Sequence, residues 1–178
     1  MRESNFASEI RKSCIEQGLY YYKIPDAYQE ERFVPKKPFD IFLINNGTFF
    51  GIELKLVKQK RLPFNIIKEH QEKGLLSINK HKGCLGLICI NFRWKNYNKA
   101  YLLHIADYLV LKGLHLSENK KSIKLENVQK YFVEAERIKG SSGKIWDMQT
   151  STSKCRYEYL SGSVIGTLSE MAEHNKGW

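Results

Sequence analysis

The sequence lacks any apolar run near the roughly 20 residues that a helix needs to cross a bilayer. Its opening residues, 1–12, also lack the apolar core of a secretory signal peptide. Only four cysteines are present, with no C-x-x-C pair and no zinc-like spacing to histidine: Cys14, Cys84, Cys89 and Cys155. We therefore expect a cytoplasmic protein with no membrane partner, no disulfide scaffold and no zinc site.

Acidic residues are scarce relative to basic ones. The chain has 29 Lys and Arg against 19 Asp and Glu, which gives a net charge of +10. Basic residues recur in KKPF (36–39), KLVKQKR (55–61), FRWKNYNK (92–99) and NKKSIK (119–124). A basic surface can be merely solvated, but an excess of this size favours a polyanionic partner, and nucleic acid is the commonest.

The pattern along the chain predicts one α/β domain spanning residues 1–178, with a mixed central sheet flanked by helices. Helices are expected at 4–17, 63–81, 106–113 and 125–138, and strands at 19–25, 39–45, 48–57, 84–91 and 99–105. Residues 27–37 are polar and irregular and predict an exposed arm. Residues 141–178 form a C-terminal extension whose pattern matches no single element.

One expected hairpin carries charges inside its strands. Asn46-Gly47 is a strong signal for a two-residue turn, and with that turn the numbers of paired residues sum to 93. Asp40 then lies opposite Glu53, with Cβ atoms roughly 5 Å apart on one face of the sheet. Alternation along the strand places Lys55 on the same face.

Two interpretations of this charged cluster remain open. A surface patch of ion pairs around Lys55 is one, although two facing carboxylates repel each other. The other is a divalent cation between hard oxygen ligands, since Mg²⁺ suits one or two carboxylates with water and a substrate phosphate. The lysine would then orient a water or stabilise charge on the phosphate, which is the chemistry of metal-assisted phosphodiester hydrolysis.

The same residues resemble a known nuclease superfamily. An acid, a hairpin and then E-x-K, here Asp40 and Glu53-Leu54-Lys55, is the motif of the PD-(D/E)XK nucleases. With KLVKQKR, LPFNIIKEHQ and GLICI in that order, the stretch 40–105 is similar to the RecU-type Holliday junction resolvases. The resemblance implies a restriction-endonuclease-like core and a homodimeric endonuclease that cuts four-way DNA junctions in recombination and repair. It also implies Mg²⁺ as cofactor, with Mn²⁺ as a substitute.

The resemblance assigns roles to individual residues. Asp40, Glu53, the Leu54 carbonyl and Glu9 of the first helix would bind the metal. Lys55 would be the catalytic lysine. Two assignments have ordinary alternatives. Glu9 can be a solvated helix charge, and Gln71, which would support the site, can be a polar residue in helix packing. Expected DNA contacts are Lys36, Lys37, Lys58, Lys60, Arg61 and His70.

Two departures from the family pattern concern the substrate. Phe39 stands between Pro38 and Asp40, and the arm at 27–37 is short for the stalk that the family carries before its acidic residue. The arm would contact an opened junction or the partner subunit, or would be only a connector. A restriction or repair nuclease on other DNA, and a non-catalytic DNA-binding module, therefore stay as alternatives. The complete set of Asp40, Glu53, Lys55 and Gln71 argues against the second.

Overall fold

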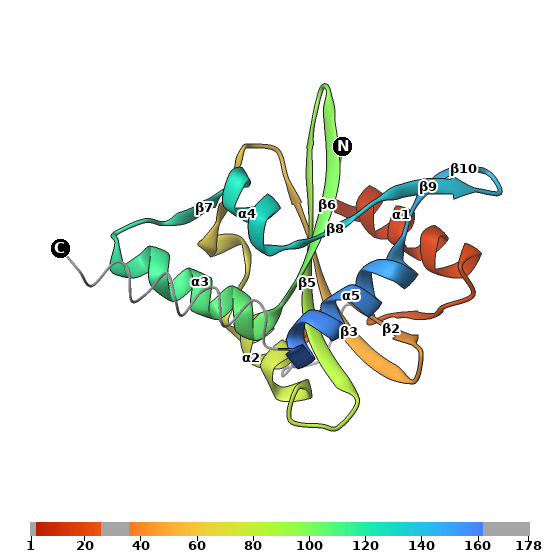
Figure 1. Cartoon of the computed structure of the whole chain (residues 1–178), viewed down its shortest axis with the longest axis horizontal. Coiled ribbons are helices and arrows are strands. Elements are labelled where there is room, and N and C mark those ends of the chain that lie inside the picture. Colours follow the sequence, from red (N-terminus) through yellow and green to blue (C-terminus); the bar gives the residue numbers. More distant parts are fainter. Residues whose placement is uncertain (1–2, 26–35, 162–178) are drawn as a thin grey trace, which may run out of the picture.

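A computed structural model describes residues 3–25 and 36–161 of the 178-residue chain (Figure 1). Six strands form one mixed sheet, in which β3 and β5 are parallel and the other neighbours are antiparallel. In sheet order they are β1 (Tyr20–Lys23), β2 (Ile41–Asn45), β3 (Thr48–Val57), β5 (Cys84–Trp94), β6 (Tyr97–His104) and β8 (Val133–Ala135).

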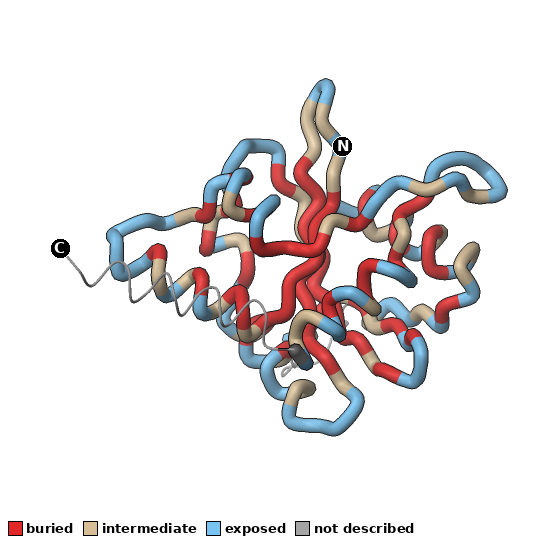
Figure 2. The backbone as a smooth tube through the Cα atoms, in the orientation of Figure 1, coloured by how far each residue is buried: buried red, intermediate tan, exposed pale blue. Residues whose placement is uncertain are grey.

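Helices cover both faces of this sheet, as the sequence predicts. One apolar core joins the sheet to α1 (Glu3–Glu16) and α5 (Met148–Ser161). A second core, on the opposite face, contains residues of η1 (Phe64–Ile66), α2 (Glu69–Ile78), α3 (Ile105–Ser117) and α4 (Leu125–Tyr131). In Figure 1, α3 and α4 lie to the left of the sheet and α1 to its right, and Figure 2 shows the buried residues concentrated along the strands between them.

Two small antiparallel sheets complete the architecture. β4 (Arg61–Pro63) pairs with β7 (Ser122–Lys124), and β9 (Arg137–Gly140) pairs with β10 (Gly143–Trp146). No helix within residues 3–25 and 36–161 is long and apolar enough to span a membrane.

The hairpin register expected from Asn46-Gly47 is confirmed. Ile41 pairs with Ile52, and Asn45 pairs with Thr48. Asn46 and Gly47 have φ of 48° and 71°, the left-handed conformation that a two-residue turn of this kind requires at both positions.

Two predicted helices are shorter than expected. The helix predicted over 63–81 begins only at Glu69. Leu62 instead lies on β4 and Phe64 begins the short helix η1; both are buried, and the Phe64 N–H donates to the Lys121 carbonyl. The helix predicted over 125–138 ends at Tyr131. Burial then alternates along β8, so these residues extend the sheet beside β6 rather than continue the helix.

The segment that matched no single element contains both a strand and a helix. Within residues 141–161, β10 packs against α1 and α5 packs against β6 and β8. The remainder of the predicted extension, residues 162–178, and most of the predicted arm, residues 27–35, lie outside the described residues.

Candidate active site

Glu53 is the most buried member of the predicted charged cluster. It lies on β3 with no solvent-exposed surface. Its Oε1 accepts a hydrogen bond from Lys55 Nζ at 2.5 Å and another from Gln71 Nε2. Among the described residues, no donor reaches its Oε2. A fully buried carboxylate oxygen without a partner is costly, which indicates a site that is completed by something else.

Helix α2 brings Gln71 to this carboxylate. Gln71 Oε1 accepts from the Lys68 N–H at 2.8 Å, which fixes the amide while its nitrogen faces Glu53. One turn further on, Gly74 lies against the segment that leads to Asp40. A Cβ at Gly74 would stand 2.5 Å from the Pro38 Cβ and 2.6 Å from its carbonyl oxygen. Only glycine therefore lets the helix approach this closely.

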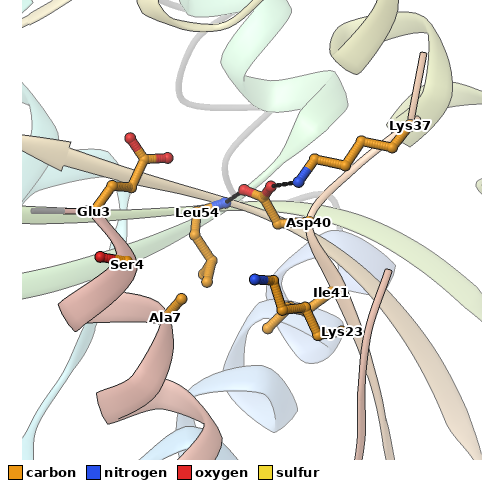
Figure 3. Close-up of a pocket in the computed structure, with 8 residues that line it drawn as sticks. All are labelled: Glu3, Ser4, Ala7, Lys23, Lys37, Asp40, Ile41 and Leu54. Atoms are coloured by element: carbon orange, nitrogen blue, oxygen red, sulfur yellow. Dashed lines mark hydrogen bonds and ion pairs between the residues drawn. The ribbon is translucent and has the colours of Figure 1, made fainter. Parts of the chain in front are cut away.

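Asp40 lies one residue before β2, beside the middle of β3. Its N–H donates to the Ile52 carbonyl at 3.2 Å, and its Oδ2 accepts from the Leu54 N–H at 2.9 Å. Its Oδ1 forms a 2.9 Å ion pair with Lys37. Figure 3 shows the interactions of the Asp40 carboxylate with the Leu54 N–H and with Lys37. Asp40 is thus held to the strand that carries Glu53, as the predicted register requires.

The electrostatics of the pair favour a bound cation. Burial, followed by the nearby charge of Asp40, raises the pKa of Glu53 to about 8, even though Lys55 acts in the opposite direction. A divalent cation between the two carboxylates would offset the burial of Glu53, because it would supply a partner for Oε2. It would also compensate the repulsion between Glu53 and Asp40. No group of three or more His, Cys, Asp or Glu side chains suited to a metal occurs in residues 3–25 and 36–161. The carboxylate oxygens of Asp40 and Glu53 are donors of the kind that hard divalent cations take.

Glu3 also lies beside this cluster, a position that the sequence reasoning did not predict. Its Oε1 lies 3.8 Å from Lys55 Nζ. With Asp40 and Leu54 it lines a pocket of about 200 Å³, shown in Figure 3. Partial burial, ahead of the opposing charge of Lys55, raises the pKa of Glu3. The available signal was helical phase, because Glu3 precedes the buried Phe6 by three positions on one face of α1.

The structure does not bring Glu9 to this site. The Glu9 carboxylate accepts from Arg93 at 2.8 and 2.6 Å and from Trp146 Nε1 at 3.1 Å. Partial burial would raise the pKa of Glu9, but these donors and the nearby Arg137 lower it overall. Glu9 precedes the buried Ile10, and its contacts with Arg93 and Trp146 fasten α1 to β5 and β10. We therefore do not include Glu9 among the proposed metal ligands.

The predicted DNA-contacting residues are dispersed around the site. Lys58 and Lys60 are exposed in the loop after β3, and Arg61 is exposed on β4. Lys36 is exposed, whereas Lys37 is half-buried against Asp40. The remaining one, His70, is half-buried in the first turn of α2.

Comparison with known proteins identifies the family. The model of the family described as RecU, recombination protein U, matches residues 8–144. The chain belongs to the RecU family. The matched region includes Asp40, Glu53, Lys55 and Gln71 but not Glu3.

Three individual proteins show the extent of the similarity. The SPbeta prophage-derived uncharacterized protein YotM of Bacillus subtilis (strain 168) is 32% identical over 125 residues, which cover 67% of this chain and 64% of YotM. The Holliday junction resolvase RecU of Staphylococcus saprophyticus is 30% identical over 88 residues, or 49% of this chain and 41% of that protein. The Holliday junction resolvase RecU of Mycoplasmopsis pulmonis is 30% identical over 138 residues, which cover 70% of this chain and 82% of that protein.

The chain thus spans less than two thirds of the length of the first two relatives. Among solved structures, the Holliday junction resolvase Hjc of Archaeoglobus fulgidus matches with a TM-score of 0.45 and 15% identity, over 58% of this chain and 78% of Hjc.

Proposed function

We propose that this protein is a metal-dependent endonuclease that cleaves four-way DNA junctions. The observation that carries the proposal is the buried carboxylate of Glu53, whose unpartnered Oε2 lies in the same cluster as Asp40 and the Lys55 ammonium. Membership of the RecU family, together with two relatives named as Holliday junction resolvases, supports the junction as substrate.

The proposed cofactor is Mg²⁺, with Mn²⁺ as a substitute, held by Asp40, Glu53 and the Leu54 carbonyl. Both are hard cations that suit oxygen ligands. When bound, such an ion supplies Lewis-acid activation of the phosphate and neutralises charge that develops on it. The raised pKa of Glu53 is consistent with a carboxylate that needs a cation beside it before it ionises fully.

The other residues would act by position and charge. The Lys55 ammonium, 2.5 Å from Glu53 Oε1, is placed to orient the attacking water or to stabilise the developing charge on the phosphate. Glu3 would hold the far side of that ammonium, since its Oε1 is 3.8 Å away. Gln71 would keep the Glu53 carboxylate in its orientation, so that Oε2 stays directed at the cation.

Exposed cations next to the catalytic strand would hold the DNA backbone. Lys58, Lys60 and Arg61 follow β3 directly and have side chains exposed to solvent. Phosphate contacts of this kind position DNA without reading its sequence. We also propose a homodimer, because symmetric cuts in two strands of a junction need two sites and a two-fold dimer is the commonest way to provide them.

The test is cleavage of labelled four-way, duplex and flap DNAs with Mg²⁺ or with EDTA. Wild-type protein should cut the four-way junction only with Mg²⁺, and Asp40→Asn should cut at least roughly 10²-fold more slowly, since a metal ligand supplies several kcal/mol to the transition state. Glu118→Gln, which removes an exposed carboxylate paired with Lys120, is the matched control and should cut normally. If the wild type cuts duplex and junction at the same rate, the site belongs to a general nuclease. If Asp40→Asn cuts as fast as the wild type, Asp40 is not a metal ligand of the active site.

A further inference from the structure

Two strands continue beyond the rest of the sheet. The pairing of β3 with β5 ends at Val57 opposite Phe92, and β8 pairs only with residues 100–102 of β6. Residues 93–98, here called the β5–β6 ribbon, pair only with each other, through Arg93 with Asn98 and Trp94 with Tyr97. Figure 1 shows this ribbon projecting from the top of the sheet, and Figure 2 shows that its tip is exposed.

The ribbon is braced on both of its faces. The rings of Trp94 and Tyr97 stack across the strands at 4.3 Å with an interplanar angle of 8°. On that side the Tyr97 hydroxyl lies 3.3 Å from Gln129 Nε2 of α4. On the other side the Arg93 guanidinium binds Glu9 of α1. Because an isolated two-stranded hairpin is marginally stable in water, these contacts explain how the projecting tip keeps a defined position.

The charge of the ribbon suits a polyanion. Residues 91–104 contain three cations and no carboxylate. Two of the three are occupied, Arg93 by Glu9 and Lys99 by Glu134. Lys95 is exposed at the tip, and no carboxylate in residues 3–25 and 36–161 forms an ion pair with it.

The register also fixes how far the tip stands from the candidate active site. Lys55 pairs with Ile90, and Lys95 lies five residues further along the chain, directly after the end of β5. At about 3.3 Å per residue, the tip is roughly 17 Å beyond the catalytic lysine along the strand direction. The basic loop that contains Lys58 and Lys60 leaves β3 at the same end of the sheet.

We infer that the β5–β6 ribbon is a DNA-contacting finger whose tip, Lys95 and Asn96, touches the backbone of a duplex arm about five base pairs from the cleaved phosphate. That spacing follows from the roughly 17 Å offset and the 3.4 Å rise of duplex DNA. A two-stranded ribbon fits the major groove, and an ammonium and an amide at its tip are suitable donors to phosphate oxygens. The inference rests on the proposed nuclease function and adds a contact surface remote from the chemistry.

Charge reversal at the two ends of the same strand tests the contact. Lys95→Glu changes the tip, whereas Lys82→Glu makes the same change in the exposed turn before β5, at its opposite end. With a labelled four-way junction in EDTA and 0.1 M salt, we expect the Kd to rise roughly tenfold for Lys95→Glu and less than twofold for Lys82→Glu. The slope of log K against log salt should fall by about one for Lys95→Glu only. Equal effects of the two variants would overturn the inference.

The position of the contact can be mapped independently. A Lys95→Cys variant in a Cys84→Ser background, whose remaining cysteines are buried, would carry an iron chelate that cuts nearby DNA by hydroxyl radicals. Strand scission should centre about five base pairs from the site cut with Mg²⁺, and the same label on Lys82→Cys should give no localised scission. If wild-type protein binds and cuts DNA but the tip label gives no localised scission, the finger alone is refuted. If wild-type protein binds no DNA, the proposed function and the finger fall together.

Discussion

Replacing Glu53 by glutamine should make the metal-free protein more stable while it stops DNA cleavage. Glutamine keeps an acceptor for the Lys55 and Gln71 donors that now bind Oε1. Its amide nitrogen would occupy the position of the unpartnered Oε2 and could donate toward Asp40. The substitution thus exchanges a buried, repelled charge for a neutral group of the same shape, at the centre of the candidate metal site.

The size and the pH dependence of this effect follow from the pKa of Glu53. Burial raises that pKa from 4.5 to about 8, so the folded state holds its proton more tightly than the unfolded chain does. The ionised side chain therefore lowers the stability of the fold as the pH rises from 4.5 through about 8. A shift of this size sets a ceiling of about 5 kcal/mol, and local relaxation around Lys55 reduces the expected gain to about 2–3 kcal/mol at pH 8.5.

Urea unfolding of wild type and Glu53→Gln, at pH 4.5 and at pH 8.5, measures this gain. The two proteins should have equal free energies of unfolding at the lower pH and differ at the higher one. Mg²⁺ at millimolar concentration should stabilise wild type and leave the variant unchanged, because binding to the folded state alone raises its stability. A variant that is less stable than wild type at pH 8.5, or equally stabilised by Mg²⁺, would refute the assignment of Glu53 as a strained metal ligand.

Five further substitutions test separate parts of the structure. Gly74→Ala should lower both the melting temperature and the cutting rate, because its methyl group meets a carbonyl oxygen 2.6 Å away. Gly113→Ala, with nothing within 4 Å, should instead stabilise α3 by up to about 1 kcal/mol. Burial raises the pKa of Asp107 to about 6, so Asp107→Asn should gain about 2 kcal/mol in urea unfolding at pH 7.5 and nothing at pH 3.8. Glu3→Gln should slow single-turnover cleavage at unchanged stability, whereas Glu9→Gln should reduce the free energy of unfolding; the reverse outcome would restore Glu9 to the site.

The hairpin shows what local sequence can establish. Asn46-Gly47 determines the turn, the turn determines the register, and the register brings Asp40 to Glu53 without any knowledge of the rest of the fold. Lys55 follows by strict alternation along the strand. For Asp40 and Lys55 the deciding interaction is thus short-range in sequence or depends on one periodicity. Gln71 was assigned to the site only through the family resemblance, and the structure puts its amide on Glu53.

The missed features depend on contacts between distant segments. Glu3 and Glu9 lie on one amphipathic helix, and only the direction in which α1 crosses β3 decides which of them reaches Lys55. The local sequence likewise does not determine where α4 ends, because residues 133–135 form a strand only by pairing with the edge of β6. The short pairing of β4 with β7 links segments about 60 residues apart, and no local pattern signals it.

The two faces of β3 explain how a strand can carry this much charge without loss of its place in the sheet. One face bears Phe50, Ile52 and Leu54, all buried against α1 and its neighbours. A slip of one residue would move Glu53 and Lys55 into that apolar core and turn the three hydrophobic side chains to the opposite face, where Glu53 now lies buried beside Gln71 of α2. The apolar face therefore fixes the register strongly, which leaves the opposite face free to hold repelling groups that only a cation and a substrate phosphate would satisfy.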